Sequence, residues 1–149
     1  MEKSAKAVET FNSGYNCAQS VLSVFAGELR TDRDTCLRIA SPFGGGMAMQ
    51  QETCGAVTGA LMAIGLKFGK GEQGSEADKE HAYKLSRGFM DRLAQRHQSL
   101  KCRQLLDGLN MNDPQEKEEI NRRQLFENRC PQLISDTVNI LKEMMNSGR

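Results

Sequence analysis

The chain has 149 residues, of which 38% are hydrophobic and 26% charged, with a formal net charge of +1 at pH 7. That length and composition allow one domain with a buried core and argue against intrinsic disorder. A net charge so close to zero argues against nucleic acid or an acidic membrane surface as the main partner.

Helical patterning runs through the whole sequence, and no segment alternates apolar and polar residues over the length of a strand. We therefore expect residues 1–149 to form a single all-α domain, a compact bundle of about six or seven helices. The expected helices cover about 3–11, 17–28, 34–40, 53–66, 75–99 and 114–126, a last helix begins at 130–131, and 102–108 is expected to be a short turn of helix.

Local signals mark several of these boundaries. Asn16 with Gln19 and Ser75 with Asp78 have the spacing of N-terminal caps, and Asp113 precedes a proline in the first helical turn. The glycine-rich "SPFGGGM" at 41–47 predicts a loop that breaks the helical pattern.

The segment 53–66, "TCGAVTGALMAIGL", is apolar on nearly all sides, which predicts the central helix of the bundle. Its three glycines, Gly55, Gly59 and Gly65, each cost about 1 kcal/mol relative to alanine. Close approach of neighbouring helices would offset that cost at Gly59, and at Gly55 the missing side chain would leave room beside Cys54.

Neither a membrane span nor a secretory signal is expected. The longest apolar run, 55–66, has about twelve residues, which is too short to cross a bilayer. The first residues lack the apolar centre of a signal peptide, so we expect a soluble, cytoplasmic protein. An odd number of cysteines, five, then indicates free thiols, metal ligands or redox groups rather than a disulfide scaffold.

Four cysteines, Cys17, Cys54, Cys102 and Cys130, lie at or near the expected start of a helix. The free amides and the positive dipole end of a helix lower the pKa of a nearby thiol, and the thiolate is the form that attacks disulfides or binds metal. Cys36 lies within a short helix and is expected to be a small apolar core residue.

Other patterns are less informative. No CxxC pair occurs, which argues against a zinc finger or a thioredoxin-type site, so the whole fold would have to assemble any four-cysteine site. His81 and His97 lie in polar helical contexts that are typical of surface or capping residues. The "FGGGM" loop lacks the Lys-Ser/Thr ending of a phosphate-binding loop, so a sharp turn is the simpler interpretation.

The segments "GYNCAQSVL", "FGGGM", "CGAVTGA", "KCRQLL" and "RCP" resemble the C_GCAxxG_C_C family, small bacterial proteins that are described as redox-active because of their cysteines. The resemblance covers about residues 8–140. It implies that the cysteines in these segments, but not Cys36, form the functional set. It also suggests the motif glycines Gly44, Gly45, Gly55 and Gly59 as candidate contacts to a cofactor.

Three hypotheses follow for Cys17, Cys54, Cys102 and Cys130. A thiol redox protein would use two of them as a dithiol–disulfide pair and would need an electron or thiol partner. A binding module would hold an iron–sulfur cluster or another thiophilic metal on all four. A helical scaffold or partner-binding subunit would bury them separately, without mutual contacts. The sequence names no substrate or partner, and a homodimer is one assembly open to it.

Overall fold

The computed structural model describes residues 2–146, and within this range it has eight α-helices and one 3-10 helix and forms no β-strand. The all-α prediction is therefore confirmed. The elements are α1 (Lys3–Asn12), α2 (Cys17–Ser23), α3 (Arg33–Ala40), η1 (Ser41–Phe43), α4 (Gly55–Phe68), α5 (Glu76–His97), α6 (Cys102–Leu105), α7 (Pro114–Arg122) and α8 (Leu125–Asn146).

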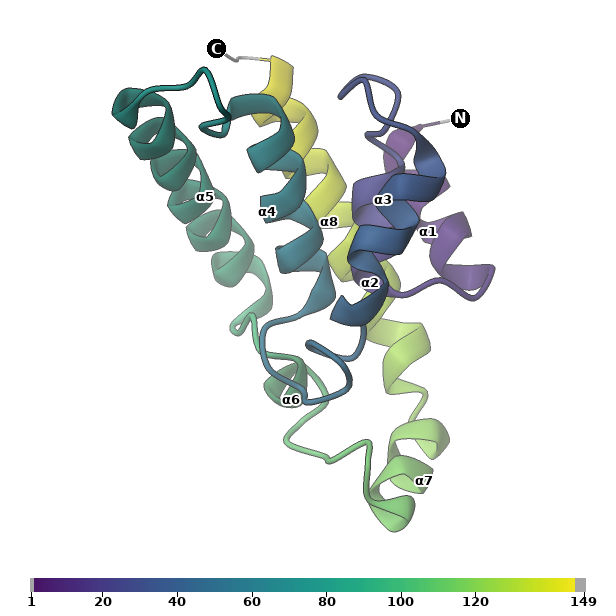
Figure 1. Ribbon diagram of the computed structural model, residues 1–149. Helices are drawn as coiled ribbons and strands as arrows, with labels where there is room; N and C mark the ends of the chain where they lie inside the picture. Colours follow the sequence, from purple (N-terminus) through teal and green to yellow (C-terminus); the bar gives the residue numbers. More distant parts are fainter. Residues whose placement is uncertain (1, 147–149) are drawn as a thin grey trace.

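Helix α4 is the centre of the bundle, as its sequence predicts. It contacts α2, α5 and α8, while α1 packs on α8 and α3 packs on α2. Figure 1 shows α4 between α5 on one side and the α1–α3 group on the other, with the long α8 behind. Burial on several sides explains why this helix is apolar nearly all round.

Two glycines of α4 allow this close packing. A Cβ atom built on Gly59 would lie 2.7 Å from the Ala18 carbonyl oxygen, and one on Gly55 would lie 2.9 Å from the Ala18 amide nitrogen. Any side chain at either position would therefore push α2 and α4 apart. Gly65 is different, because a Cβ there would meet nothing within 4 Å, so packing does not account for it.

The predicted caps are present, but three helix boundaries differ from the sequence-based expectation. Asn16 and Ser75 both form capping boxes, and Asp113 caps α7. Helix α2 ends at Ser23 rather than near residue 28, because the chain tightens there into turns in which the Phe25 amide donates to the Leu22 carbonyl at 3.1 Å. Helix α7 ends at Arg122 rather than near residue 126.

The last helix does not begin at the Cys130–Pro131 pair. Helix α8 starts at Leu125 and continues through Pro131, which lies inside it. A proline in this second turn loses its own amide donor and crowds the carbonyl of Glu127, and burial of the apolar face of α8 offsets that cost, so the helix continues.

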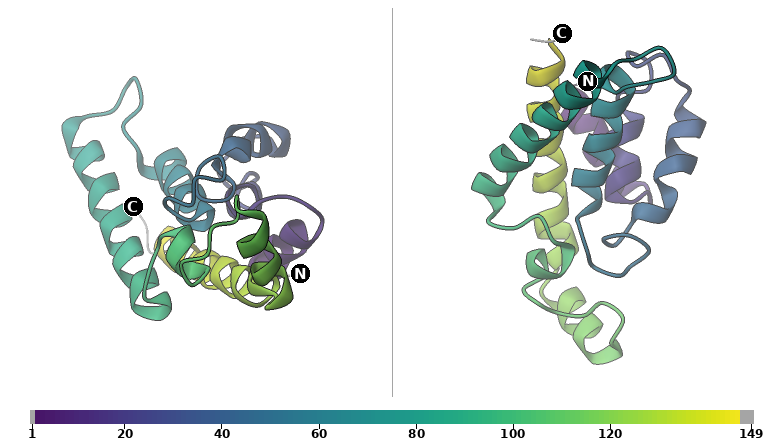
Figure 2. Two further views of the ribbon diagram at one scale, coloured as in Figure 1. Left: turned by 90° about the horizontal axis from the view of Figure 1, so that it is seen from below. Right: turned by 60° about the vertical axis from the view of Figure 1, so that its left-hand side comes forward.

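The helices bury two apolar clusters. The main core lies inside the bundle, and a smaller cluster of Leu106, Met111, Ile120 and Leu125 lies beneath α6 and α7. Figure 2 shows α7 projecting beyond the end of the bundle that is opposite both termini. Among residues 2–146, no helix is long and apolar enough to cross a membrane.

Candidate functional site

A cleft of about 830 Å³ opens where the bundle meets the α6–α7 region, and it brings four cysteines together. Cys17, Cys54, Cys102 and Cys130 all line it, although they come from four separate helical segments. Cys36 lies elsewhere, in the main core, with an exposed fraction of 1%. All five cysteines are free thiols.

The starts of α2 and α4 place Cys17 beside Cys54. Cys17 is the first residue of α2, directly after the capping residue Asn16, and Cys54 is the N-cap residue of α4. Between them lies Gly55, where a Cβ atom would be only 3.2 Å from the Cys17 Cβ. The absence of a side chain at Gly55 therefore allows the two thiols to come together.

A short backbone pairing fixes Cys54 relative to Cys102. The Cys54 amide donates to the Leu100 carbonyl at 2.8 Å, and the Cys102 amide donates to the Glu52 carbonyl at 2.7 Å. These bonds flank an isolated antiparallel bridge between Thr53 and Lys101. The segment before α4 and the segment before α6 are thus joined at their cysteines.

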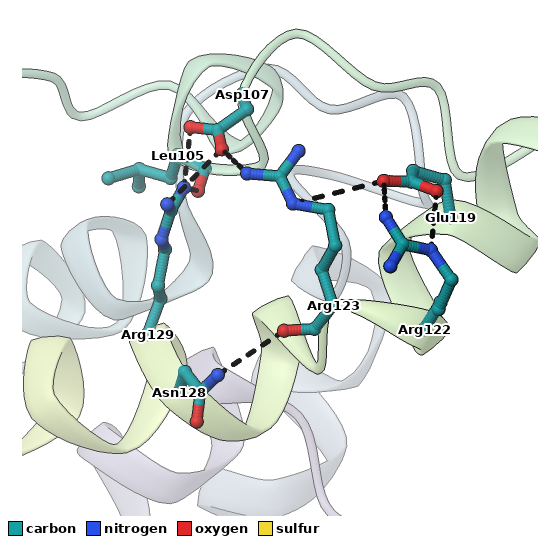
Figure 3. A network of polar contacts seen from close by, with 7 residues as sticks. All are labelled: Leu105, Asp107, Glu119, Arg122, Arg123, Asn128 and Arg129. Atoms are coloured by element: carbon teal, nitrogen blue, oxygen red, sulfur yellow. Dashed lines mark hydrogen bonds and ion pairs between the residues drawn. The ribbon is translucent and has the colours of Figure 1, made fainter.

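Cys130 is placed by the body of α8 and not by a helix start, which corrects the prediction for this residue. The preceding Arg129 fixes this part of α8, since its guanidinium donates to the Leu105 carbonyl at 2.8 Å and to the Asp107 carboxylate at 2.7 Å. Arg123 also pairs with Asp107, as Figure 3 shows. The hydrogen bond from Arg129 holds the pKa of Asp107 below its usual value, so this carboxylate stays charged.

Within the cleft, the Cys17 thiol interacts with two others. Cys130 and Cys54 are its neighbours, and its single S–H can be donated to only one of them at a time. Hydrogen bonding to Cys130 and Cys54, together with burial and the nearby charges, raises the pKa of Cys17 well above the ordinary cysteine value. Cys17 is therefore the thiol that keeps its proton and donates.

Cys54 behaves in the opposite way. The hydrogen bond from Cys17 lowers the pKa of Cys54. The nearby amides of Ala56 and Val57 at the start of α4 lower it further, without a capping hydrogen bond to the Cys54 side chain. Burial opposes this shift but does not reverse its direction. The arrangement makes Cys54 the most readily ionised of the pair, as a reactive thiol must be.

Cys102 is also a weakly acidic thiol. Burial raises its pKa to about 12, and the charges of Cys54 and Cys130 contribute in the same direction. Its position at the first residue of the four-residue helix α6 does not compensate. The sequence-based expectation that every helix-start cysteine would have a lowered pKa is therefore wrong for Cys17 and Cys102, because burial and neighbouring thiols outweigh the helix dipole.

The loop before Cys54 has a backbone conformation that the sequence does not reveal. Gly45 and Gly46 have positive φ angles, but so do Met47, Ala48, Met49 and Gln51. A left-handed conformation costs about 1–2 kcal/mol for each non-glycine residue. Hydrogen bonds hold the turn closed, among them those from the Gln51 and Glu52 amides to the Gly45 and Gly46 carbonyls, each 2.9 Å long. The two glycines predict a turn, but nothing in the following residues indicates its left-handed continuation.

Gln51 is a second feature that sequence reasoning missed. Its side chain is 5% exposed, donates to the Leu109 carbonyl at 2.8 Å and accepts from the Met111 amide at 2.8 Å. These two hydrogen bonds hold the left-handed turn against the segment after α6. At the turn itself, a Cβ on Gly46 would lie 2.8 Å from the Cys102 Cβ, so this glycine makes room for Cys102.

The other candidates from the sequence are placed as follows. Gly44, Gly45 and Gly55 line the cleft, whereas Gly59 faces α2. The His81 ring meets the Phe68 ring edge-on, with centroids 5.5 Å apart.

His97 lines the cleft and pairs with Asp136 at 2.8 Å. Within the part of the chain that the structure describes, neither histidine belongs to a group of three or more side chains that could hold a metal ion.

Four thiols are suitable ligands for an iron–sulfur cluster or a thiophilic metal. Within residues 2–146, however, no three His, Cys, Asp or Glu side chains are arranged so that they could hold one metal ion. The described arrangement therefore offers no ligand set for a single metal ion, and the iron–sulfur expectation stays a prediction.

Comparison with known proteins gives one match. A family model described as "Putative redox-active protein (C_GCAxxG_C_C)" matches residues 15–144, which is most of the chain and includes all four cleft cysteines. No curated protein and no solved structure matches the chain.

Proposed function

Because the chain belongs to the C_GCAxxG_C_C family, we propose that it is a dithiol–disulfide redox protein in which Cys54 is the nucleophile and Cys17 the resolving thiol. The observation that carries this proposal is that the starts of α2 and α4 bring Cys17 and Cys54 together at Gly55, where a Cβ would lie 3.2 Å from the Cys17 Cβ, and the interaction of the two thiols lowers the pKa of Cys54. Two thiols in contact, one ionising readily and the other retaining a proton, suit thiol–disulfide exchange.

The reaction balances with a disulfide of a thiol partner as the oxidant. The Cys54 thiolate attacks one sulfur of the partner disulfide, forms a mixed disulfide and releases one partner thiolate. Cys17 then attacks the Cys54 sulfur, so that the Cys17–Cys54 bond forms and the second partner thiolate leaves. The protein loses two electrons, the partner disulfide gains two, and the proton of Cys17 goes to a released thiolate.

The electrostatics of the pair favour this order of steps. In the reduced protein, the interaction with Cys130 is the largest cause of the raised pKa of Cys17, and the hydrogen bond and charge of Cys54 add to it. Once Cys54 is in a mixed disulfide its charge is gone, so part of the effect that keeps Cys17 protonated is removed. Cys17 then becomes a better nucleophile at the moment when it is needed.

The alternative functions receive less support from the geometry. A scaffold with separately buried cysteines predicts no mutual contacts, whereas Cys17 contacts two other thiols in one cleft. A metal-binding module requires a group of ligands that the described arrangement does not supply. The electron or thiol partner, the homodimer and the compartment stay predictions.

Trapping of the mixed disulfide tests the proposal. The reduced Cys17→Ser variant is treated with glutathione disulfide, quenched in acid and mapped by mass spectrometry. We expect glutathione to accumulate on Cys54, because the resolving thiol is missing, while the wild type proceeds to an internal disulfide. Cys36→Ser is the matched control, since Cys36 lies outside the cleft, and should behave as wild type. Absence of the adduct on Cys54 in Cys17→Ser would overturn the proposal.

A further inference from the structure

The proposed nucleophile is the least accessible of the four cleft thiols. Cys54 has an exposed fraction of 5%, whereas Cys17, Cys102 and Cys130 are half-buried. Thiol–disulfide exchange requires the attacking sulfur to come into bonding contact with a sulfur of the partner disulfide, so its rate depends on access. A disulfide that reacts with Cys54 must therefore enter the cleft.

We infer that the substrate is a low-molecular-weight disulfide that enters the cleft, and not the disulfide of a folded protein. This inference rests on the proposed function, because it names the substrate class of the Cys54–Cys17 pair. The volume of the cleft is about 830 Å³. Sites that enclose small molecules have volumes of about 300–1,000 Å³. One small disulfide is reduced to two small thiols while the Cys17–Cys54 disulfide forms, so the reaction balances without a further reactant.

Hydrogen bonds hold the walls of the cleft beside Cys54 in place. The Cys54 amide donates to the Leu100 carbonyl at 2.8 Å, which holds the segment before α6 against the start of α4. The left-handed turn at 45–51 also lines the cleft, and Gln51 and Asn112 both fasten it. The Asn112 side-chain amide donates to the Met49 carbonyl at 2.8 Å. A folded partner would have to break such bonds or present its disulfide on a protruding segment, whereas a small molecule needs neither.

The lining of the cleft combines apolar walls with a few polar groups. Leu106, Met111 and Leu133 are buried apolar residues of the lining. Arg96 and Arg129 also line the cleft, and both side chains remain partly accessible to solvent. This combination is typical of small-molecule sites. It suits a disulfide whose methylene groups flank the sulfur atoms and whose ends are polar.

Comparison of two oxidants tests the inference. Reduced wild-type protein is treated with glutathione disulfide or with oxidised protein disulfide isomerase, a folded protein whose disulfide has a higher reduction potential than the cytosolic glutathione couple. Formation of the Cys17–Cys54 disulfide is followed by acid quenching and mass spectrometry. The rates of N-acetylcysteine, a fully accessible thiol, correct for the intrinsic reactivity of each oxidant. After this correction, we expect glutathione disulfide to react faster by on the order of tenfold, because access to Cys54 limits the folded oxidant.

A matched pair of variants on α8 relates the effect to the cleft. Asn128 and Glu127 are both exposed, but of the two only Asn128 lines the cleft. Asn128→Trp should narrow the cleft and lower the rate with glutathione disulfide by on the order of tenfold, because access is reduced. Glu127→Trp adds the same side chain outside the cleft and should react at the wild-type rate.

The outcomes separate the two proposals. Equal corrected rates with the two oxidants, or equal rates for Asn128→Trp and Glu127→Trp, overturn the small-molecule substrate and leave the dithiol function standing. The absence of a Cys17–Cys54 disulfide with either oxidant overturns both. The wild-type comparison decides even where Asn128→Trp fails to fold, which far-ultraviolet circular dichroism would reveal.

Discussion

Substitution of alanine at Gly59 and Gly65 separates close helix packing from helix propensity. Both glycines lie in α4, so alanine gains about 1 kcal/mol of helix propensity at each position. At Gly59 the new Cβ would lie 2.7 Å from the Ala18 carbonyl oxygen, and overpacking of this kind costs about 1–3 kcal/mol. At Gly65 the new Cβ would meet nothing within 4 Å, so nothing opposes the gain.

The change in the free energy of unfolding should therefore be clearly more favourable for Gly65→Ala than for Gly59→Ala. We expect Gly65→Ala to be stabilised by about 1 kcal/mol and Gly59→Ala to lose about 0–2 kcal/mol. For a chain of 149 residues, about 1 kcal/mol corresponds to about 3 °C in Tm, so the Tm of Gly65→Ala should exceed that of Gly59→Ala by about 3–9 °C. Thermal unfolding followed by circular dichroism measures this difference. A Gly59→Ala variant as stable as Gly65→Ala would refute the packing argument.

Three further predictions concern the cleft. Cys54→Ser should lower the rate of thiol alkylation near neutral pH by on the order of tenfold, whereas Cys36→Ser should leave it unchanged, as peptide mass spectrometry would show. Because the pKa of Cys102 is raised to about 12, its contribution to folding stability is complete below the ordinary cysteine value and is lost as pH rises through about 12. The unfolding free energy in urea should thus fall more steeply with rising alkaline pH in wild type than in Cys102→Ala, and equal slopes would contradict this. Asp107→Asn, which removes one of the two partners of Arg129, should lower the Tm without preventing the glutathione adduct on Cys54 in Cys17→Ser; an unchanged Tm would argue against the anchoring role.

Short-range signals in the sequence were sufficient to predict most of the helices and the central place of α4. Asn16 with Gln19 and Ser75 with Asp78 form the predicted capping boxes, because a cap is decided by residues three positions apart. The central place of α4 follows from its all-round apolar surface. The start of α8 was missed because Pro131 is a strong local signal for a helix start, whereas burial of Leu125 in the smaller cluster is a tertiary effect.

The candidate site was predictable in its membership but not in its chemistry. The family motif identifies Cys17, Cys54, Cys102 and Cys130, which line one cleft. The helix-start signal is right for the first three and wrong for Cys130, which lies within α8. The sequence does not show which thiols touch, and contact and burial decide the direction of each pKa shift. The left-handed turn could not be predicted beyond Gly45 and Gly46, because it depends on contacts such as those of Gln51 with residues far along the chain.

The account depends most on Cys54 being the thiol that ionises first. Thiolate absorbance near the far-ultraviolet edge, followed as pH rises in wild type and Cys54→Ser, measures this directly. We predict one thiolate in reduced wild-type protein that forms below the ordinary cysteine range and is missing from Cys54→Ser. The same early ionisation in both proteins, or none in wild type, would contradict the account.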